Sequence, residues 1–141
     1  MTIKNLPSFK KKIKKKLSVN VKKNVLIAVM RGTGIVEDTV QTSLKQKGTG
    51  RTYKRKGSDH IASAAGQPPA TDQGNLANNI TTSIKSKNDG SVIGQVISSA
   101  AYSKSLEFGT TNVLARPFMQ PALNKNKNKI IKIFKQMKVT K

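Results

Sequence analysis

The chain has 141 residues, which is the length of a single domain, and it contains no cysteine, no tryptophan and one histidine. Disulfides, thiolate metal sites and multi-histidine clusters are therefore excluded, and six acidic residues leave little material for acid–base catalysis. The 27 lysines and arginines give a formal net charge of +21, which indicates either a polyanionic neighbour or a Lys-rich composition that serves solubility alone. We expect no enzymatic activity, no metal and no cofactor.

Residues 1–18 form a Lys-rich amphipathic segment, separate from one α+β domain over residues 19–141. Its apolar residues recur at helical spacing: Leu6, Phe9, Ile13 and Leu17. Its candidate polyanion contacts are Lys10, Lys11, Lys12, Lys14, Lys15 and Lys16. Three interpretations stay open: a helix packed on the domain, a membrane-surface helix or a phosphate-binding arm. The apolar run over residues 25–30 is too short for a secretory signal or a membrane span.

Residues 19–46 carry an apolar stripe with a 3.6-residue period, which predicts one long helix. Ser18 or Asn20 is the expected N-cap. Gly32 and Gly34 each cost about 1 kcal/mol relative to alanine inside a helix. They either allow close packing against another element or mark a break.

Residues 47–73 are a long polar excursion of the functional or disordered kind. Tyr53 lies among basic residues and is either a structural or subunit contact or, less favoured because it is alone, a base-stacking residue. We expect His60 to be a hydrogen-bonded structural side chain. Asp72 is expected to cap the short turn that leads through Leu76.

Residues 80–98 predict a β-hairpin, because apolar residues alternate on both sides of Asn88-Asp89-Gly90. The second strand has apolar residues on both faces, which predicts cover by the long helix on one side and by a partner subunit on the other.

The last part of the chain predicts a short helix that ends at Gly109 and a final helix over residues 121–138. In the short helix one face is expected to hold Ala101, Tyr102, Ser105, Leu106 and Phe108. Glu107 is expected to pair with Arg116 and brace the turn between the two helices. The stripe of the final helix is expected to hold Leu123, Ile130, Phe134 and Met137. The fold class is α+β: a long N-terminal helix and a C-terminal helix packed on a small antiparallel sheet, with a long polar loop or β-arm excursion.

Two groups of motifs, in order and with matching spacing, cover residues 48–124. The downstream group is Leu106-Glu107-Phe108-Gly109-Thr110, Ala115-Arg116-Pro117-Phe118-Met119 and Pro121-Ala122-Leu123. The upstream group includes Gly50-Arg51-x-Tyr53, His60-x-Ala62-Ser63-Ala64 and Pro68-Pro69-Ala70. Together they resemble the neck and tail-completion proteins of long-tailed bacteriophages, a family to which the lambda Z tail-completion protein is related.

The resemblance implies a structural virion protein that joins tail to head as a ring around the DNA channel, with a hexamer expected. Its implied partners are other copies of itself, the adjacent head-closure and tail-terminator rings, and DNA in the channel, but no membrane. It would be assembled in the bacterial host cytoplasm and reside in the virion neck. The structural motif residues are Leu106, Glu107, Phe108, Gly109, Thr110, Arg116, Pro117, Phe118 and Pro121. The subunit-contact candidates are Arg51, Tyr53, His60, Pro68 and Pro69.

Two rival functions come from the charge. A nonspecific nucleic-acid-binding protein would bind any duplex with a steep salt dependence. A membrane-surface protein that uses residues 3–17 is the weaker rival.

Overall fold

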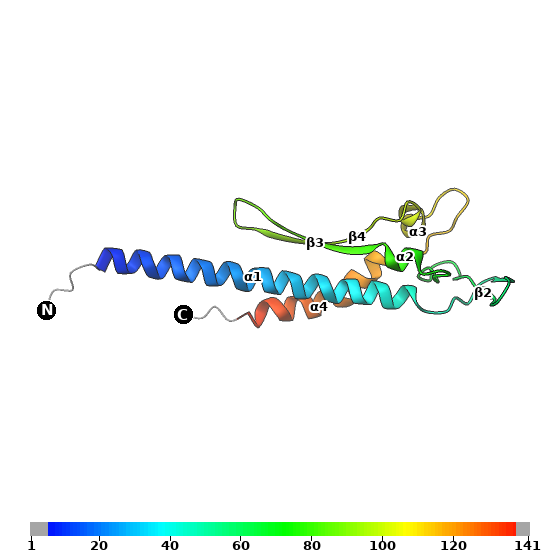
Figure 1. The fold of residues 1–141 in the computed structure, drawn as a ribbon, viewed down its shortest axis with the longest axis horizontal. Coiled ribbons are helices and arrows are strands. Elements are labelled where there is room, and N and C mark those ends of the chain that lie inside the picture. The colour runs from blue at the N-terminus through cyan, green and yellow to red at the C-terminus, as the bar shows by residue number, and fades with distance from the viewer. Residues whose placement is uncertain (1–5, 138–141) are drawn as a thin grey trace.

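The computed structural model describes residues 6–137, and it confirms the α+β class with two long helices packed on a two-stranded antiparallel sheet (Figure 1). The elements in chain order are α1 (Leu6–Leu44), β1 (Thr52–Tyr53), β2 (His60–Ile61), α2 (Asn75–Asn78), β3 (Ile80–Ser86), β4 (Val92–Ser98), α3 (Ser103–Phe108) and α4 (Met119–Lys135).

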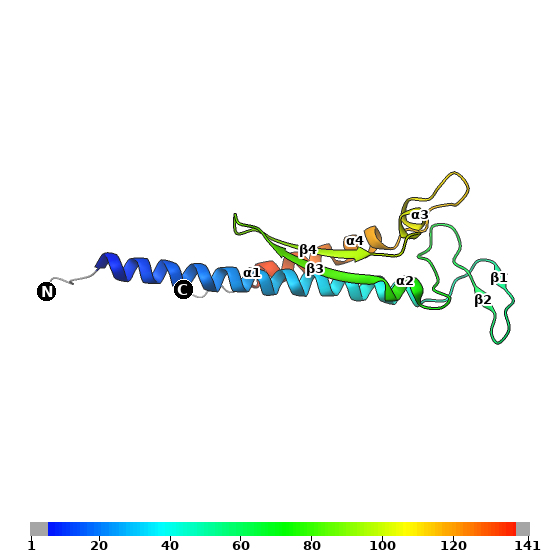
Figure 2. The same cartoon turned by 45° about the horizontal axis from the view of Figure 1, so that its top comes forward.

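Helix α1 runs without interruption through the expected boundary between residues 18 and 19. Neither Ser18 nor Asn20 is an N-cap, because both lie inside the helix, and the Ser18 hydroxyl donates to the carbonyl of Lys15 at 2.8 Å. The first turns of α1 extend past both the hairpin and α4 (Figures 1 and 2). The side chains of the expected N-terminal apolar stripe lie outside the part of the chain that the structure describes.

Helix α4 packs antiparallel to α1 through small and polar side chains (Figure 1). Gly32 does not break α1. A Cβ added at Gly32 would lie 3.5 Å from Cγ2 of Ile130, so this glycine lies at the contact between the two helices. Asn126 is completely buried, and its Nδ2 donates to Oγ1 of Thr39 at 2.8 Å. Close packing is thus the correct one of the two interpretations for Gly32.

The predicted hairpin is formed by β3 and β4, with Ile80 opposite Ser98 and Ile84 opposite Gly94. Gly90 has φ 85°, a left-handed value that glycine adopts without strain. The sheet lies across α1, and Gly94 is the point of closest approach: an added Cβ would overlap the Thr33 hydroxyl.

Only one face of the hairpin is covered by α1. On the other face Ile93 and Ile97 are 37% and 40% exposed. The expected cover by the long helix is confirmed, and the second cover, a partner subunit, stays a prediction.

The main core lies where the C-terminal half of α1 meets α2, the start of β3 and the first turns of α4. It contains Val36, Val40, Leu44, Leu76, Ala77, Ile80, Phe118 and Ala122. The α1 residues in this cluster belong to the predicted apolar stripe, which is confirmed over these turns. The core is small and occupies one part of an elongated molecule.

The polar excursion contains the short antiparallel arm β1–β2, which pairs Tyr53 with His60. The backbone N of Gly50 donates to the carbonyl of Ala62 at 2.8 Å, which holds the base of the arm together. Asp72 does not cap α2. Gly74 occupies the N-cap position at φ 77°, and Asp72 forms an ion pair with Arg55 instead.

Candidate functional site

The corner between α3 and α4 is organised by the carboxylate of Glu107. Its Oε2 accepts from the backbone N atoms of Phe118 at 2.8 Å and Met119 at 3.0 Å, and its Oε1 accepts from Gln120 N at 2.9 Å. These are amides at the start of a helix, which have no partner within the helix itself. A negative charge there also interacts favourably with the helix dipole. Glu107 is therefore the N-terminal cap of α4, supplied from another helix.

The expected ion pair between Glu107 and Arg116 does not form. The backbone N of Arg116 donates to the carbonyl of Leu106 at 2.7 Å, and its side chain lines a different pocket from the one that Glu107 lines. The corner is braced by hydrogen bonds from the α4 backbone and not by an ion pair.

Most of the other motif residues have structural positions at this corner. Phe118 is 1% exposed, and Gly109 ends α3 as predicted. Its φ of 75° is positive, but its ψ of 176° is extended, so it does not adopt the left-handed helical conformation that was expected. Thr110 forms a bridge with Val113, which closes the short loop after α3. Pro117 precedes α4, and Pro121 lies in its first turn, where no amide proton is needed.

Phe108 does not share the environment of Leu106, with which it was expected on one face of the short helix, because of the two only Leu106 packs against the core. Phe108 is 76% exposed, and Leu114 in the following loop is 74% exposed. The periodicity of a six-residue helix is too short to fix which side faces the protein. These two side chains present apolar surface beside the motif corner.

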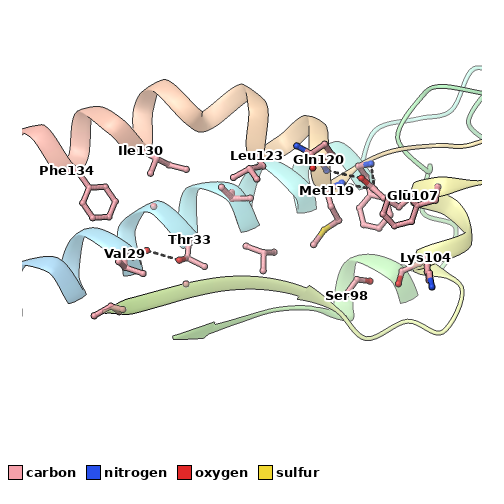
Figure 3. Close-up of a pocket in the computed structure, with 18 residues that line it drawn as sticks. Val29, Thr33, Ser98, Lys104, Glu107, Met119, Gln120, Leu123, Ile130 and Phe134 are labelled. Carbon is pink, nitrogen blue, oxygen red and sulfur yellow. Dashed lines mark hydrogen bonds between the residues drawn. The ribbon is translucent and has the colours of Figure 1, made fainter. Parts of the chain in front are cut away.

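An open apolar groove of about 670 Å³ runs between α1, β4 and α4 (Figure 3). Val29 comes from its α1 floor, and Leu123, Ile130 and Phe134 from its α4 wall. Leu123 and Phe134 are 46% and 37% exposed, because α4 and the hairpin diverge over α1. Sequence periodicity placed these α4 residues on one stripe, but it gave no sign that the stripe borders an open groove.

The upstream subunit-contact candidates are partly brought together by the β1–β2 arm. The rings of Tyr53 and His60 stack with centroids 6.5 Å apart, and the Arg51 guanidinium lies 5.6 Å from the centre of the Tyr53 ring. Pro69 is buried, whereas Pro68 lies apart from the arm in a pocket with Pro121. Tyr53 therefore has structural contacts within its own chain, and its role in subunit contact stays a prediction.

The charged side chains in the N-terminal half of α1 are all basic. No acidic residue precedes Glu37. Lys11, Lys12 and Lys15 are exposed, while the side chains of Lys10, Lys14 and Lys16 lie outside the described residues. A helix that projects alone with this charge is suited to a polyanionic surface.

Within residues 6–137, no three histidine and acidic side chains come close enough together to hold a metal ion. His60 Nδ1 lies 3.6 Å from Oδ1 of Asp72, which fits its expected role as a structural side chain. No helix in the same range is both long and apolar enough to cross a bilayer. The described surface offers a groove, an open sheet face and basic projections, which are features suited to binding.

Comparisons with protein-family models, with curated proteins and with solved structures found no match to this chain.

Proposed function

We propose that this chain is a structural protein in the neck of a long-tailed bacteriophage, a tail-completion component that joins the tail to the head. It acts by assembling into a ring around the DNA channel, hexameric as the motif resemblance implies, between the head-closure and tail-terminator rings. It is incorporated into the virion after synthesis in the host cytoplasm, and it catalyses no reaction.

The observation that carries this proposal is the amount of surface that the single chain exposes. Its accessible surface is 10907 Å², whereas a compact monomer of its mass, 15.3 kDa, exposes about 7,100 Å². The chain therefore exposes more surface than a compact monomer. Part of the exposed surface is apolar and lies in the groove, on the outer face of the hairpin and at Phe108. Exposed apolar side chains at several places on one chain are typical of proteins that bind other proteins. The chain thus has the surfaces of an assembly subunit.

The arrangement of the projections also supports assembly. The β1–β2 arm lies at one end of the molecule, and the first turns of α1 project from the other (Figure 2). When the arm or the first turns of α1 of one copy contact a neighbouring copy, they can bind a different part of its surface. Such head-to-tail contacts close into a ring when the rotation between subunits is right.

The test is to inactivate the gene in its phage and examine the particles by electron microscopy. We expect DNA-filled heads and unattached tails, with joining restored when the intact gene is supplied in trans. Normal joined particles in the absence of the protein would contradict the proposal.

Nonspecific binding to nucleic acid is the second candidate, favoured by the projecting basic turns of α1. Fluorescence anisotropy measures the affinity for a short DNA duplex at a series of salt concentrations. The logarithm of this affinity should then fall steeply and linearly with the logarithm of the salt concentration. The triple variant Lys11→Glu, Lys12→Glu, Lys15→Glu should weaken binding at low salt and flatten the slope. An unchanged affinity and slope would exclude this segment as the binding element.

A further inference from the structure

A second cavity, of about 400 Å³, lies between the polar excursion and the α3–α4 corner, on the opposite side of the corner from the groove. We call it the Arg116 pocket. Its polar lining includes Arg55, His60, Ser63, Asp72, Tyr102 and Arg116. None of these residues lines the apolar groove or belongs to the Lys-rich turns of α1.

Arg116 is held firmly in this pocket without an acidic partner. Its backbone N donates to the carbonyl of Leu106, and the carbonyl of its neighbour Ala115 accepts from Gly66 N at 3.0 Å. Its guanidinium forms no ion pair within residues 6–137, and its Nε is buried without a hydrogen-bond partner. A buried donor of a charged group that lacks a partner is costly and unusual in a folded protein.

Ser63 also lines this cavity and carries a second hydrogen-bonding group without a partner. It is 4% exposed, and its Oγ is also buried without a partner. Because Gly66 is hydrogen-bonded to Ala115, the segment that carries Ser63 is held beside the segment that carries Arg116. Two unsatisfied polar groups from chain segments about fifty residues apart therefore line one pocket.

The pocket keeps a net positive charge when the ion pair between Arg55 and Asp72 is taken into account. Asp72 is its single acidic residue, and this carboxylate is already paired with Arg55 and lies 3.6 Å from His60 Nδ1. The charge of Arg116 is left without compensation. A ligand that completes the pocket must therefore be an anion.

We propose that the Arg116 pocket binds a phosphate group, either free phosphate or a phosphate of a nucleic-acid backbone. The planar guanidinium donates to two oxygens of an oxyanion at once, and a phosphate has further oxygens for the Ser63 hydroxyl. A phosphate bound there would balance the charge of Arg116 and offer acceptor oxygens to both unpartnered groups. This inference is independent of the proposed role in the phage neck.

The experiment is a titration of the full-length ¹⁵N-labelled chain with inorganic phosphate, at mildly acidic pH and at constant ionic strength maintained with chloride. The chain has four arginines, so its spectrum contains four Nε–Hε correlations. The Arg116 correlation is assigned by its loss in Arg116→Gln, or by through-bond connection to its own backbone amide. We expect this correlation alone to show a large shift that saturates.

A matched pair of serine variants separates this site from general attraction to a basic protein. Ser63→Ala should weaken the phosphate affinity about tenfold, since it removes one hydrogen bond to a charged ligand. Ser83→Ala, on the hairpin, should leave the affinity unchanged. Small, non-saturating shifts of all four arginine correlations, or no shift at Arg116, would overturn the proposal.

A parallel titration with a short DNA duplex identifies the source of the phosphate. If the duplex shifts the Arg116 correlation and free phosphate competes with it, the pocket takes backbone phosphates. If free phosphate alone shifts that correlation, the pocket takes the free ion. If neither ligand moves it, the pocket binds no phosphate and the inference is wrong.

Discussion

Oε2 of Glu107 lies 2.8 Å from the backbone N of Phe118, and this contact joins α3 to the first turn of α4 across eleven residues. The same carboxylate also accepts from Met119 and Gln120. One glutamate thus satisfies three amides that the helix itself leaves free. Two of the three downstream motifs, residues 106–110 and 115–119, meet at this carboxylate, which gives the Glu107 position a structural reason.

Removal of this cap should lower the stability of the whole chain. Glu107→Ala is expected to reduce the free energy of unfolding by about 2 kcal/mol, since it removes both the cap and a favourable charge at the helix start. Glu107→Gln keeps one oxygen acceptor but replaces the other with an NH2 donor and loses the charge, so its loss should be smaller than that of Glu107→Ala. Urea unfolding measures both. Asp38→Ala, at an exposed position of α1, is the control, and a Glu107→Ala loss no larger than the control would refute the cap.

The absence of an ion pair between Glu107 and Arg116 predicts an additive double mutant. The losses of Glu107→Ala and Arg116→Ala should sum to the loss of the double variant within about 0.5 kcal/mol. The measurement is a double-mutant cycle by urea unfolding. A double variant that is little worse than either single variant would show that the two side chains act as a pair.

Gly94 and Gly34 should respond in opposite directions to alanine. At Gly94 a Cβ would overlap the Thr33 hydroxyl and lie 2.8 Å from Cγ1 of Val29, so Gly94→Ala should destabilise the fold by about 1–3 kcal/mol through overpacking. At Gly34 no atom lies within 4 Å, so Gly34→Ala should stabilise α1 by about 0.5–1 kcal/mol. Thermal unfolding of the two variants checks this, and equal shifts in the same direction would contradict the packing of β4 on α1.

Asp89, in the hairpin turn, should make the stability of the chain depend on pH. Hydrogen bonds from the Ser91 side chain, and then from its backbone amide, hold the pKa of Asp89 below its ordinary value of 3.8. Its contribution to stability is therefore present above that value and is lost as the pH falls through the lower, folded-state pKa. A ¹³C titration of the carboxyl group should give a midpoint below 3.8, and Ser91→Ala should raise it. An unchanged midpoint in Ser91→Ala would remove Ser91 as the cause.

Phe108 and Leu114 should matter for assembly and not for folding. Both side chains are largely exposed, so Phe108→Ser and Leu114→Ser should change the free energy of unfolding by less than about 0.5 kcal/mol. If the corner lies at a subunit contact, either variant should reduce complementation of a phage that lacks the gene. Ile131→Ser, at an exposed position of α4 that lines neither the groove nor the Arg116 pocket, is the comparison for solubility effects. Full complementation by both variants would place the contact elsewhere.

The elements with strong local signals could be predicted from sequence. The 3.6-residue period of the apolar stripe over residues 19–46 predicted the buried turns of α1 around Val36 and Val40. The turn sequence Asn88-Asp89-Gly90 predicted the hairpin. The start of α1 could not be predicted, because Ser18 resembles an N-cap in sequence. In the structure its hydroxyl bonds back to the helix carbonyl of Lys15, a competing local arrangement.

The corner and the pockets depend on contacts between distant segments. A carboxylate that caps a helix from another helix has no fixed spacing in sequence, so sequence alone favours the nearby Arg116 as the partner of Glu107. Sequence likewise favours the adjacent turn as the partner of Asp72, whereas in the structure Asp72 forms an ion pair with Arg55 across the excursion. The apolar groove follows from the divergence of α4 from the hairpin over α1, which no single segment encodes.

The central claim is that this protein belongs to the phage neck, and the most direct measurement is its location in purified particles. Mass spectrometry gives its copy number, and antibody labelling in the electron microscope gives its position. The account predicts a fixed, small number of copies at the junction between head and tail. Absence of the protein from intact, joined particles would contradict the account.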